Sequence, residues 1–118
     1  MTLVLGATPN PSRYANIATK RLLRNGHEVV LVGIKKGEID GQKILNGKPD
    51  LETEIDTVTL YVGPRHQPEY YDYLLRLKPR RIIFNPGTEN AELIELAKEA
   101  GIKPVVACTL VMLSTGEY

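Results

Sequence analysis

The sequence predicts an α/β domain of three layers, in which helices cover both faces of a doubly wound parallel sheet. Two observations predict this class. Short apolar runs of strand length alternate along the chain with segments whose apolar residues recur at helical spacing. Several of these runs are continuously apolar, which is typical of parallel strands that are buried on both faces. Right-handed crossovers between successive strands then place helices on each side of one sheet.

The first strand and the first helix are predicted on either side of a short loop near the start of the chain. Leu3–Leu5 form the strand, Gly6 begins the loop, and Ser12 is placed to cap the helix with its side chain. Gly26 follows the last helical residue, at the position where a left-handed backbone ends many helices. The apolar residues of this helix recur at Tyr14, Ile17, Ala18 and Leu22.

The rest of the chain repeats the same order of strand and helix. Further strands are predicted at Val29–Val32, around Lys43–Leu45, and at Thr57–Val62, Arg81–Phe84 and Val105–Ala107. The one around Lys43–Leu45 is a short edge strand, because polar residues and glycines surround it. Pro68 opens a second helix, Lys78 and Pro79 stop it, and a third helix ends before Gly101. The inward-facing helical residues are Tyr71, Leu74 and Leu77, then Leu93, Leu96, Ala97 and Ala100.

Length and composition bound the class of protein. The 118 residues suit one domain over residues 1–118, and the net charge of +1 comes from acidic and basic residues that are mixed along the chain. Such mixing excludes a broad basic face for nucleic acid or an acidic membrane. The single cysteine, Cys108, excludes an internal disulfide, and the chain shows no bilayer-spanning segment and no signal peptide. We therefore expect a soluble, cytoplasmic protein.

Four loops are expected at the carboxyl ends of the predicted strands. They run from Gly6 to Arg13, from Gly33 to Lys36, from Gly63 to His66 and from Asn85 to Glu89. In an open parallel sheet such loops converge on the crevice where the strand order reverses, here between the first and fourth strands. The helix after the first loop presents unpaired N–H groups and the positive end of its dipole to that crevice. The sequence therefore predicts a site for a phosphate-bearing ligand.

The same loops restrict which nucleotide the site takes. Of the three glycines in the NAD fingerprint the first loop has only Gly6, with Thr8 and Pro11 in the other two positions. An NAD site also takes an acidic residue after the second strand, to accept a hydrogen bond from the ribose 2′-hydroxyl. The chain instead has Lys35 and Lys36 there, and ammonium groups suit a phosphate on the adenosine ribose, as in NADP or coenzyme A (CoA).

Five short motifs carry a resemblance to a known family. They are Asn10–Arg13, Gly26–Val29, Tyr61–Pro64, Glu99–Ile102 and Val105–Cys108. Through these motifs almost the whole chain resembles the small stand-alone CoA-binding proteins, relatives of the CoA-binding domain of the succinyl-CoA synthetase α subunit. The resemblance implies a five-stranded, Rossmann-like domain that binds CoA or an acyl-CoA through its ADP moiety. The chain departs from the family at Gly33 and Ile34, where Asn-Pro is usual, and in the apolar segment after Cys108.

The resemblance also implies which residues bind CoA. Backbone amides of the first loop and Ser12 would face the pyrophosphate, Arg13 would be a salt partner, and Lys35 or Lys36 would face the ribose phosphate. The loop after the fourth strand would line the adenine and pantetheine side, and the loop after the fifth would form the far wall. The full set is Gly6, Ala7, Thr8, Pro9, Asn10, Ser12, Arg13, Lys35, Lys36, Val62, Gly63, Arg65, Asn85, Pro86 and Gly87.

No catalytic residue and no metal ligand are predicted. His66 lies in a crevice loop without an evident acidic partner to orient it, and His27 lies at the opposite end of the sheet. The sequence thus favours a protein that binds CoA or an acyl-CoA without chemistry of its own. An NADP-binding enzyme or subunit that uses the same crevice is the alternative, and a partner module that has lost ligand binding is a third. A homo-oligomer and a complex with a partner enzyme both stay open.

Overall fold

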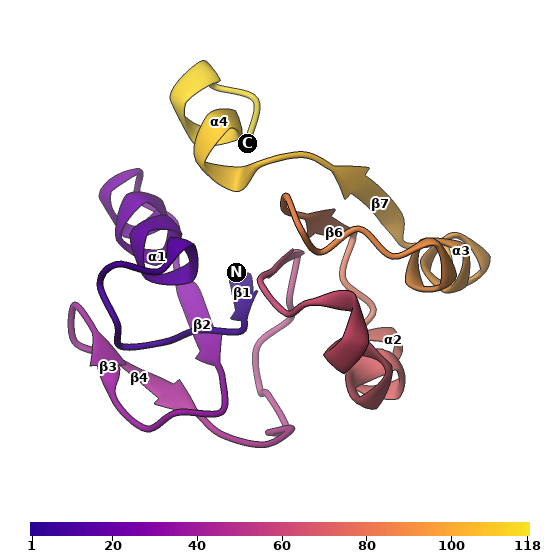
Figure 1. Ribbon diagram of the computed structural model, residues 1–118, viewed down its shortest axis with the longest axis horizontal. Coiled ribbons are helices and arrows are strands. Elements are labelled where there is room, and N and C mark those ends of the chain that lie inside the picture. Colours follow the sequence, from indigo (N-terminus) through magenta and orange to yellow (C-terminus); the bar gives the residue numbers. More distant parts are fainter.

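The computed structural model describes residues 1–118 and contains one seven-stranded sheet with helices on both faces (Figure 1). The strands are β1 (Thr2–Leu5), β2 (Val29–Val32), β3 (Glu38–Ile39), β4 (Gln42–Leu45), β5 (Thr57–Leu60), β6 (Arg81–Phe84) and β7 (Lys103–Val106). The helices are α1 (Tyr14–Arg24), α2 (Tyr71–Leu77), α3 (Ala91–Glu99) and α4 (Thr109–Thr115), and a 3-10 helix, η1 (Pro64–Tyr70), leads directly into α2. The predicted α/β class is confirmed.

The strand order, β3-β4-β2-β1-β5-β6-β7, is that of a doubly wound sheet. All neighbouring strands are parallel except β3 and β4. From β1 the chain builds outward through β2 to β4, then returns to place β5 on the other side of β1, which is the predicted point of reversal. Leu5 pairs with both Val32 and Leu60, and Leu60 pairs with Phe84, so the central strands end level with one another.

The sheet has more strands than the five that the family resemblance implies. The apolar runs account for six of them, including the edge strand β4, and the seventh is β3. Asp40 and Gly41 both have a positive φ, 46° and 83°, which is the conformation of a two-residue hairpin turn. This turn folds β3 back onto β4 and adds an antiparallel strand at the edge of the sheet.

The helices lie in pairs on the two faces of the sheet, with α1 and α4 on one side and α2 and α3 on the other (Figure 1). Leu5 and Phe84 point to the α2 and α3 face, where they pack in one buried cluster with Leu74 and Leu93. On the opposite face, the side chains of β1, β2 and β4 pack against Leu22 of α1. Each fully buried leucine of these clusters contributes about 2 kcal/mol.

Helix α1 begins differently from the prediction. Its N-cap residue is Arg13, whose side chain makes no capping hydrogen bond, and the prediction of Ser12 as the cap is wrong. Both the Ser12 amide and the Ser12 hydroxyl donate to Oδ1 of Asn10, at 3.0 and 2.8 Å. This local bond to a side chain two residues earlier holds Ser12 in a turn instead of at the start of the helix. The helix ends as predicted, with Gly26 at a φ of 82°.

The second helix also begins differently. Pro64 fixes the first residue of η1, and Pro68 lies inside that 3-10 helix rather than opening an α-helix. Leu74 of α2 is fully buried, as expected. Lys78 adopts the left-handed conformation, with a φ of 47°, and Pro79 follows, so the predicted end of the helix is confirmed.

Helix α3 follows the predicted pattern along most of its length. Leu93 and Ala97 are fully buried, whereas Leu96 is half-buried and Ala100 is exposed. Ala100 is exposed because it lies at the end of the helix, next to Gly101 with its φ of 78°.

The segment after β7 forms a helix that the sequence did not predict. Cys108 is half-buried and caps α4, whose buried residues Thr109 and Met112 recur at helical spacing. After α4 the chain returns to the sheet, and the Tyr118 ring lies against the side chains of His27 and Arg81, each 4.7 Å away. No helix of the chain combines the length and the apolar character that crossing a bilayer requires.

Candidate functional site

The four predicted loops meet above the carboxyl ends of β1, β2, β5 and β6 and enclose a cleft of about 480 Å³. The predicted convergence at the reversal of strand order is therefore confirmed. The residues that line the cleft are Gly6, Thr8, Asn10, Arg13, Tyr14, Ala15, Ile34, Lys35, Tyr61, Val62, Gly63, His66, Glu69, Tyr70, Pro86, Gly87 and Thr88.

Two glycines let the loop after β1 pack closely against the segments that follow β2 and β5. Gly6 has a φ of 100°, and a Cβ on it would lie 2.6 Å from the carbonyl oxygen of Tyr61. A Cβ on Gly33 would lie 2.1 Å from the carbonyl oxygen of Ala7. Both neighbours are backbone atoms, which cannot turn away as a side chain does. Glycine is therefore required at these two positions by the approach of one loop to another.

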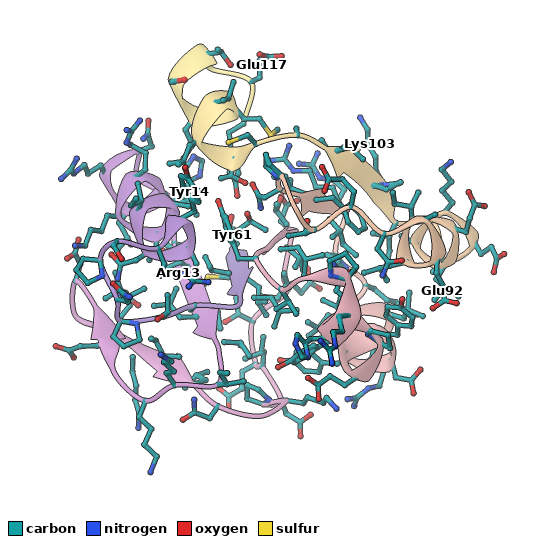
Figure 2. The ribbon with its side chains drawn as sticks, in the orientation of Figure 1. Arg13, Tyr14, Tyr61, Glu92, Lys103 and Glu117 are labelled. Atoms are coloured by element: carbon teal, nitrogen blue, oxygen red, sulfur yellow. The ribbon has the colours of Figure 1, made fainter.

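The start of α1 supplies unpaired hydrogen-bond donors at the cleft. The backbone amides of Thr8, Tyr14 and Ala15 donate to no acceptor within the protein. The positive end of the helix dipole lies at the same place, and no acidic residue occupies the first turn of α1. In Figure 2, Arg13 and Tyr14 lie at this start, and Tyr61 lies between α1 and the first turn of α4. This arrangement attracts an anion.

The charged side chains of the cleft are mostly cationic. Arg13 and Lys35 are exposed and form no ion pair; the ion pairs of the protein join Arg80 to Asp56 and Lys98 to Glu95. Glu69 and His66 line the cleft from η1. His66 makes no side-chain hydrogen bond with Glu69 or any other residue.

Tyr61 forms part of the cleft wall without being able to exchange a proton near neutral pH. Burial of its side chain raises the pKa of the hydroxyl to about 12, against a smaller lowering effect of the neighbouring Thr59 and Thr109 hydroxyls. The hydroxyl therefore stays neutral at neutral pH.

Nine of the fifteen predicted site residues line the cleft, and six do not. The nine are Gly6, Thr8, Asn10, Arg13, Lys35, Val62, Gly63, Pro86 and Gly87, and the six are Ala7, Pro9, Ser12, Lys36, Arg65 and Asn85. Asn85 is only 1% exposed, and its side chain is occupied by the Thr59 hydroxyl, the Leu60 carbonyl and the Thr109 amide, at 2.8 to 2.9 Å. Ala7 is buried, and the other four are exposed beside the cleft.

Several cleft residues were missed by the sequence analysis. Tyr14 and Ile34 are 71% and 85% exposed, although both are large and apolar. Their positions next to Arg13 and Lys35 were a usable signal, since exposed apolar residues beside cations suit a ligand with both rings and phosphates. Asn16 lies two residues after Tyr14 in α1. Its side-chain nitrogen Nδ2 donates to the Thr8 carbonyl at 3.0 Å, and its Oδ1 is buried without a partner.

A doubly wound sheet with a polar cleft where its strand order reverses defines the class of Rossmann-like ligand-binding domains. A sequence model of the CoA binding domain matches residues 1–114, and the chain belongs to this family. No curated protein matches the sequence.

Solved structures are similar over nearly the whole chain. A crystal structure of an uncharacterized protein is 56% identical with a TM-score of 0.96, and the match covers 99% of this chain and 96% of that one. A hypothetical protein from Pyrococcus horikoshii OT3 is 32% identical with a TM-score of 0.87, covering 97% and 81% of the two chains. The dinucleotide-forming acetyl-coenzyme A synthetase 1 of Ca. Korarchaeum cryptofilum shares the fold at 17% identity and a TM-score of 0.72. That match covers 87% of this chain and 25% of the synthetase.

Proposed function

We propose that the protein binds CoA or an acyl-CoA through its ADP moiety and performs no reaction on its own. The observation that carries this proposal is the end of β2, where Lys35 lines the cleft and no acidic residue is present. A carboxylate there would accept a hydrogen bond from an unmodified ribose, whereas an ammonium group favours a ribose that bears a phosphate. Membership of the CoA binding domain family supports CoA among the nucleotides with that phosphate.

The start of α1 would hold the pyrophosphate. The free amides of Thr8, Tyr14 and Ala15 and the helix dipole provide neutral donors, and the exposed side chain of Arg13 adds a positive charge. Ser12 would act indirectly, because its bonds to Asn10 shape the loop that presents those amides.

The other loops would hold the two ends of the ligand. Lys35, with the exposed Lys36 next to it, would bind the ribose phosphate. The adenine and pantetheine portions would lie against the loops after β5 and β6, at Val62, Gly63, Pro86 and Gly87. Ala7 and Pro9 would belong to the backbone of the pyrophosphate loop, and Arg65 would contact the ligand from the rim.

The arrangement of the titratable groups supports binding rather than chemistry. Acid-base catalysis requires a group whose protonation state and orientation are both fixed toward the reacting atom. His66 is exposed and hydrogen-bonded to no carboxylate, and the hydroxyl of Tyr61 keeps its proton at neutral pH. The protein would then act by presenting CoA to another protein or by holding it in reserve.

Calorimetry with CoA, NADP and NAD tests this proposal. We expect CoA to bind most tightly, because only CoA offers the ribose phosphate together with the pantetheine arm. NAD binding as tight as CoA binding would overturn the assignment of the ribose-phosphate site. NADP binding without CoA binding would establish the alternative, an NADP-binding enzyme or subunit. A mass spectrum of the ligand that co-purifies with the native protein identifies any acyl group.

A further inference from the structure

We propose that Gln67 is a positioning residue for the cleft, which holds the loops after β5 and β6 at a fixed separation. This inference rests on the proposed function for its effect on CoA. Gln67 lies in η1, is completely buried and does not line the cleft. It therefore acts on a ligand only through the backbone that it holds.

One side-chain amide ties the two loops together. Nε2 of Gln67 donates to the carbonyl of Val62 at 2.9 Å and to the carbonyl of Thr88 at 2.8 Å. Val62 follows β5 and Thr88 follows β6, and both residues line the cleft. The adjacent Gly63 and Gly87 line it as well. These two hydrogen bonds of Gln67, which we call the clamp, therefore lie directly behind the wall assigned to adenine and pantetheine.

A second amide fixes the orientation of the first. Oε1 of Gln67 accepts a hydrogen bond from Nδ2 of Asn90 at 2.8 Å, and Asn90 Oδ1 in turn accepts the amides of Glu92 and Leu93 at the start of α3. A flipped Gln67 would place its oxygen against the two carbonyls and its nitrogen against the Asn90 donor. Both Gln67 N–H groups are thus committed to the loops.

The clamp continues on the β6 side. The Thr88 hydroxyl and the Thr88 amide both donate to the carbonyl of Asn85, at 2.8 and 2.9 Å. The turn from Asn85 to Thr88 is therefore closed at its base, and Gln67 sets its distance from Val62. Removing the Gln67 amide leaves the buried carbonyl of Thr88 and the partly buried carbonyl of Val62 without their donor, and the two carbonyls regain partners only if the loops move toward water.

The experiment measures CoA affinity and amide hydrogen exchange in Gln67→Met. Methionine keeps the volume of the side chain and removes its donors. We expect CoA affinity to fall by about tenfold or more. We also expect the amides of Thr88 and His66, which are bonded to the bases of the two loops, to exchange at least about tenfold faster while those of α1 stay unchanged. The matched control is Val29→Ala, a core truncation at the opposite end of the sheet.

The outcomes separate the clamp from the proposed function. If Gln67→Met binds CoA as tightly as Val29→Ala while both are folded, Gln67 does not position the cleft. If the wild-type protein binds no CoA, the proposed function fails, and the exchange of Thr88 and His66 alone decides the clamp: unchanged rates in the variant overturn it.

A second substitution covers the case in which Gln67→Met does not fold. Gln67→Glu keeps the shape, and where the pH is high enough to ionise the buried carboxyl group it places a carboxylate against the two carbonyls. We expect weak CoA binding that recovers relative to wild type as the pH falls, because a protonated carboxyl group donates one hydrogen bond. An affinity of Gln67→Glu that equals that of the wild type at every pH at which both are folded would overturn the inference.

Discussion

The two sides of the cleft are built in different ways. The loop after β1 touches its neighbours backbone to backbone, with Ala7 against Gly33 after β2 and Gly6 against Tyr61 after β5. The loops after β5 and β6 are held by buried side-chain amides, above all those of Gln67 and Asn85.

The two sides of the cleft therefore tolerate different substitutions. A backbone contact without side-chain space cannot accommodate an added atom, so the β1 and β2 side is sensitive to any Cβ. A side-chain amide can be replaced without added volume, so the β5 and β6 side is sensitive to the loss of a donor or acceptor. The charges that would select the ligand lie on the first side, at Arg13 and Lys35.

The largest effect is expected from Gly33→Ala. Its Cβ would lie 2.1 Å from the Ala7 carbonyl oxygen, so the β1 loop must move, and we expect a loss of about 4 kcal/mol in the free energy of unfolding and no measurable CoA binding. The matched control is Gly63→Ala, where a Cβ meets nothing within 4 Å and φ is −63°. Urea denaturation compares the two. Equal stabilities would mean that the loops are not held by this contact.

The next effect belongs to the amide side. Asn85→Ala leaves the Leu60 carbonyl and the Thr109 amide buried without partners, and we expect a loss of about 3 kcal/mol in stability. Because Thr109 begins α4, the amides of α4 should also exchange faster. Asn25→Ala is the control, since its side chain makes one exposed hydrogen bond, to the Arg21 carbonyl. An Asn85 variant as stable as the Asn25 variant would show that α4 is held by its apolar contacts alone.

The two sides also differ in how far the sequence predicts them. Neighbouring residues predict the turn at Gly6, the end of β2 and the placement of Lys35. This is possible because a glycine or a charged residue indicates a turn or a charge at its own position in the sequence. Gln67 contacts residues 5 and 21 positions away, and no local pattern marks such a contact. Asn85 was predicted in the far wall of the site; its loop faces the cleft, while its side chain is hydrogen-bonded to groups inside the protein, which the local sequence does not indicate.

The helix α4 was not predicted, for a related reason. The segment after Cys108 is apolar and short, and its helical state depends on burying Thr109 and Met112 on a sheet that the segment itself does not specify. The β3 strand, by contrast, has a local signal in the sequence, because Asp40 and Gly41 are residues that suit a two-residue hairpin turn.

A smaller, ligand-specific effect is expected from replacing both Lys35 and Lys36 with Ala. Charge-assisted hydrogen bonds contribute about 1.5–3 kcal/mol, so CoA affinity should fall by roughly one to two factors of ten. Dephospho-CoA, which lacks the ribose phosphate, should bind almost as before. Stability should hardly change, because both side chains are exposed and unpaired. Calorimetry with CoA and dephospho-CoA tests this prediction. If the double substitution weakens the binding of both ligands equally, the lysines act only through their general positive charge and not through the ribose phosphate.

The smallest effect lies at the other end of the sheet and should leave the cleft untouched. The Thr57 hydroxyl, and then Arg80, lower the pKa of Asp56 below its usual value of 3.8, because both stabilise the carboxylate. A lowered pKa in the folded state means that the stabilisation is complete well above pH 3.8 and is lost as the pH falls through the lowered pKa.

Asp56→Asn removes this titration while keeping the shape. The Asp56 and Arg80 side chains are 48% and 72% exposed, so solvent screens their ion pair, and we expect the variant to lose less than about 1 kcal/mol at neutral pH. That difference should shrink as the pH falls below about 4, in urea denaturation at matched salt. Since Asp56 precedes β5, far from the carboxyl ends of the strands, CoA affinity at neutral pH should equal that of the wild type. A drop in CoA affinity would mean that the two ends of the sheet are coupled, contrary to a cleft held by its own loops.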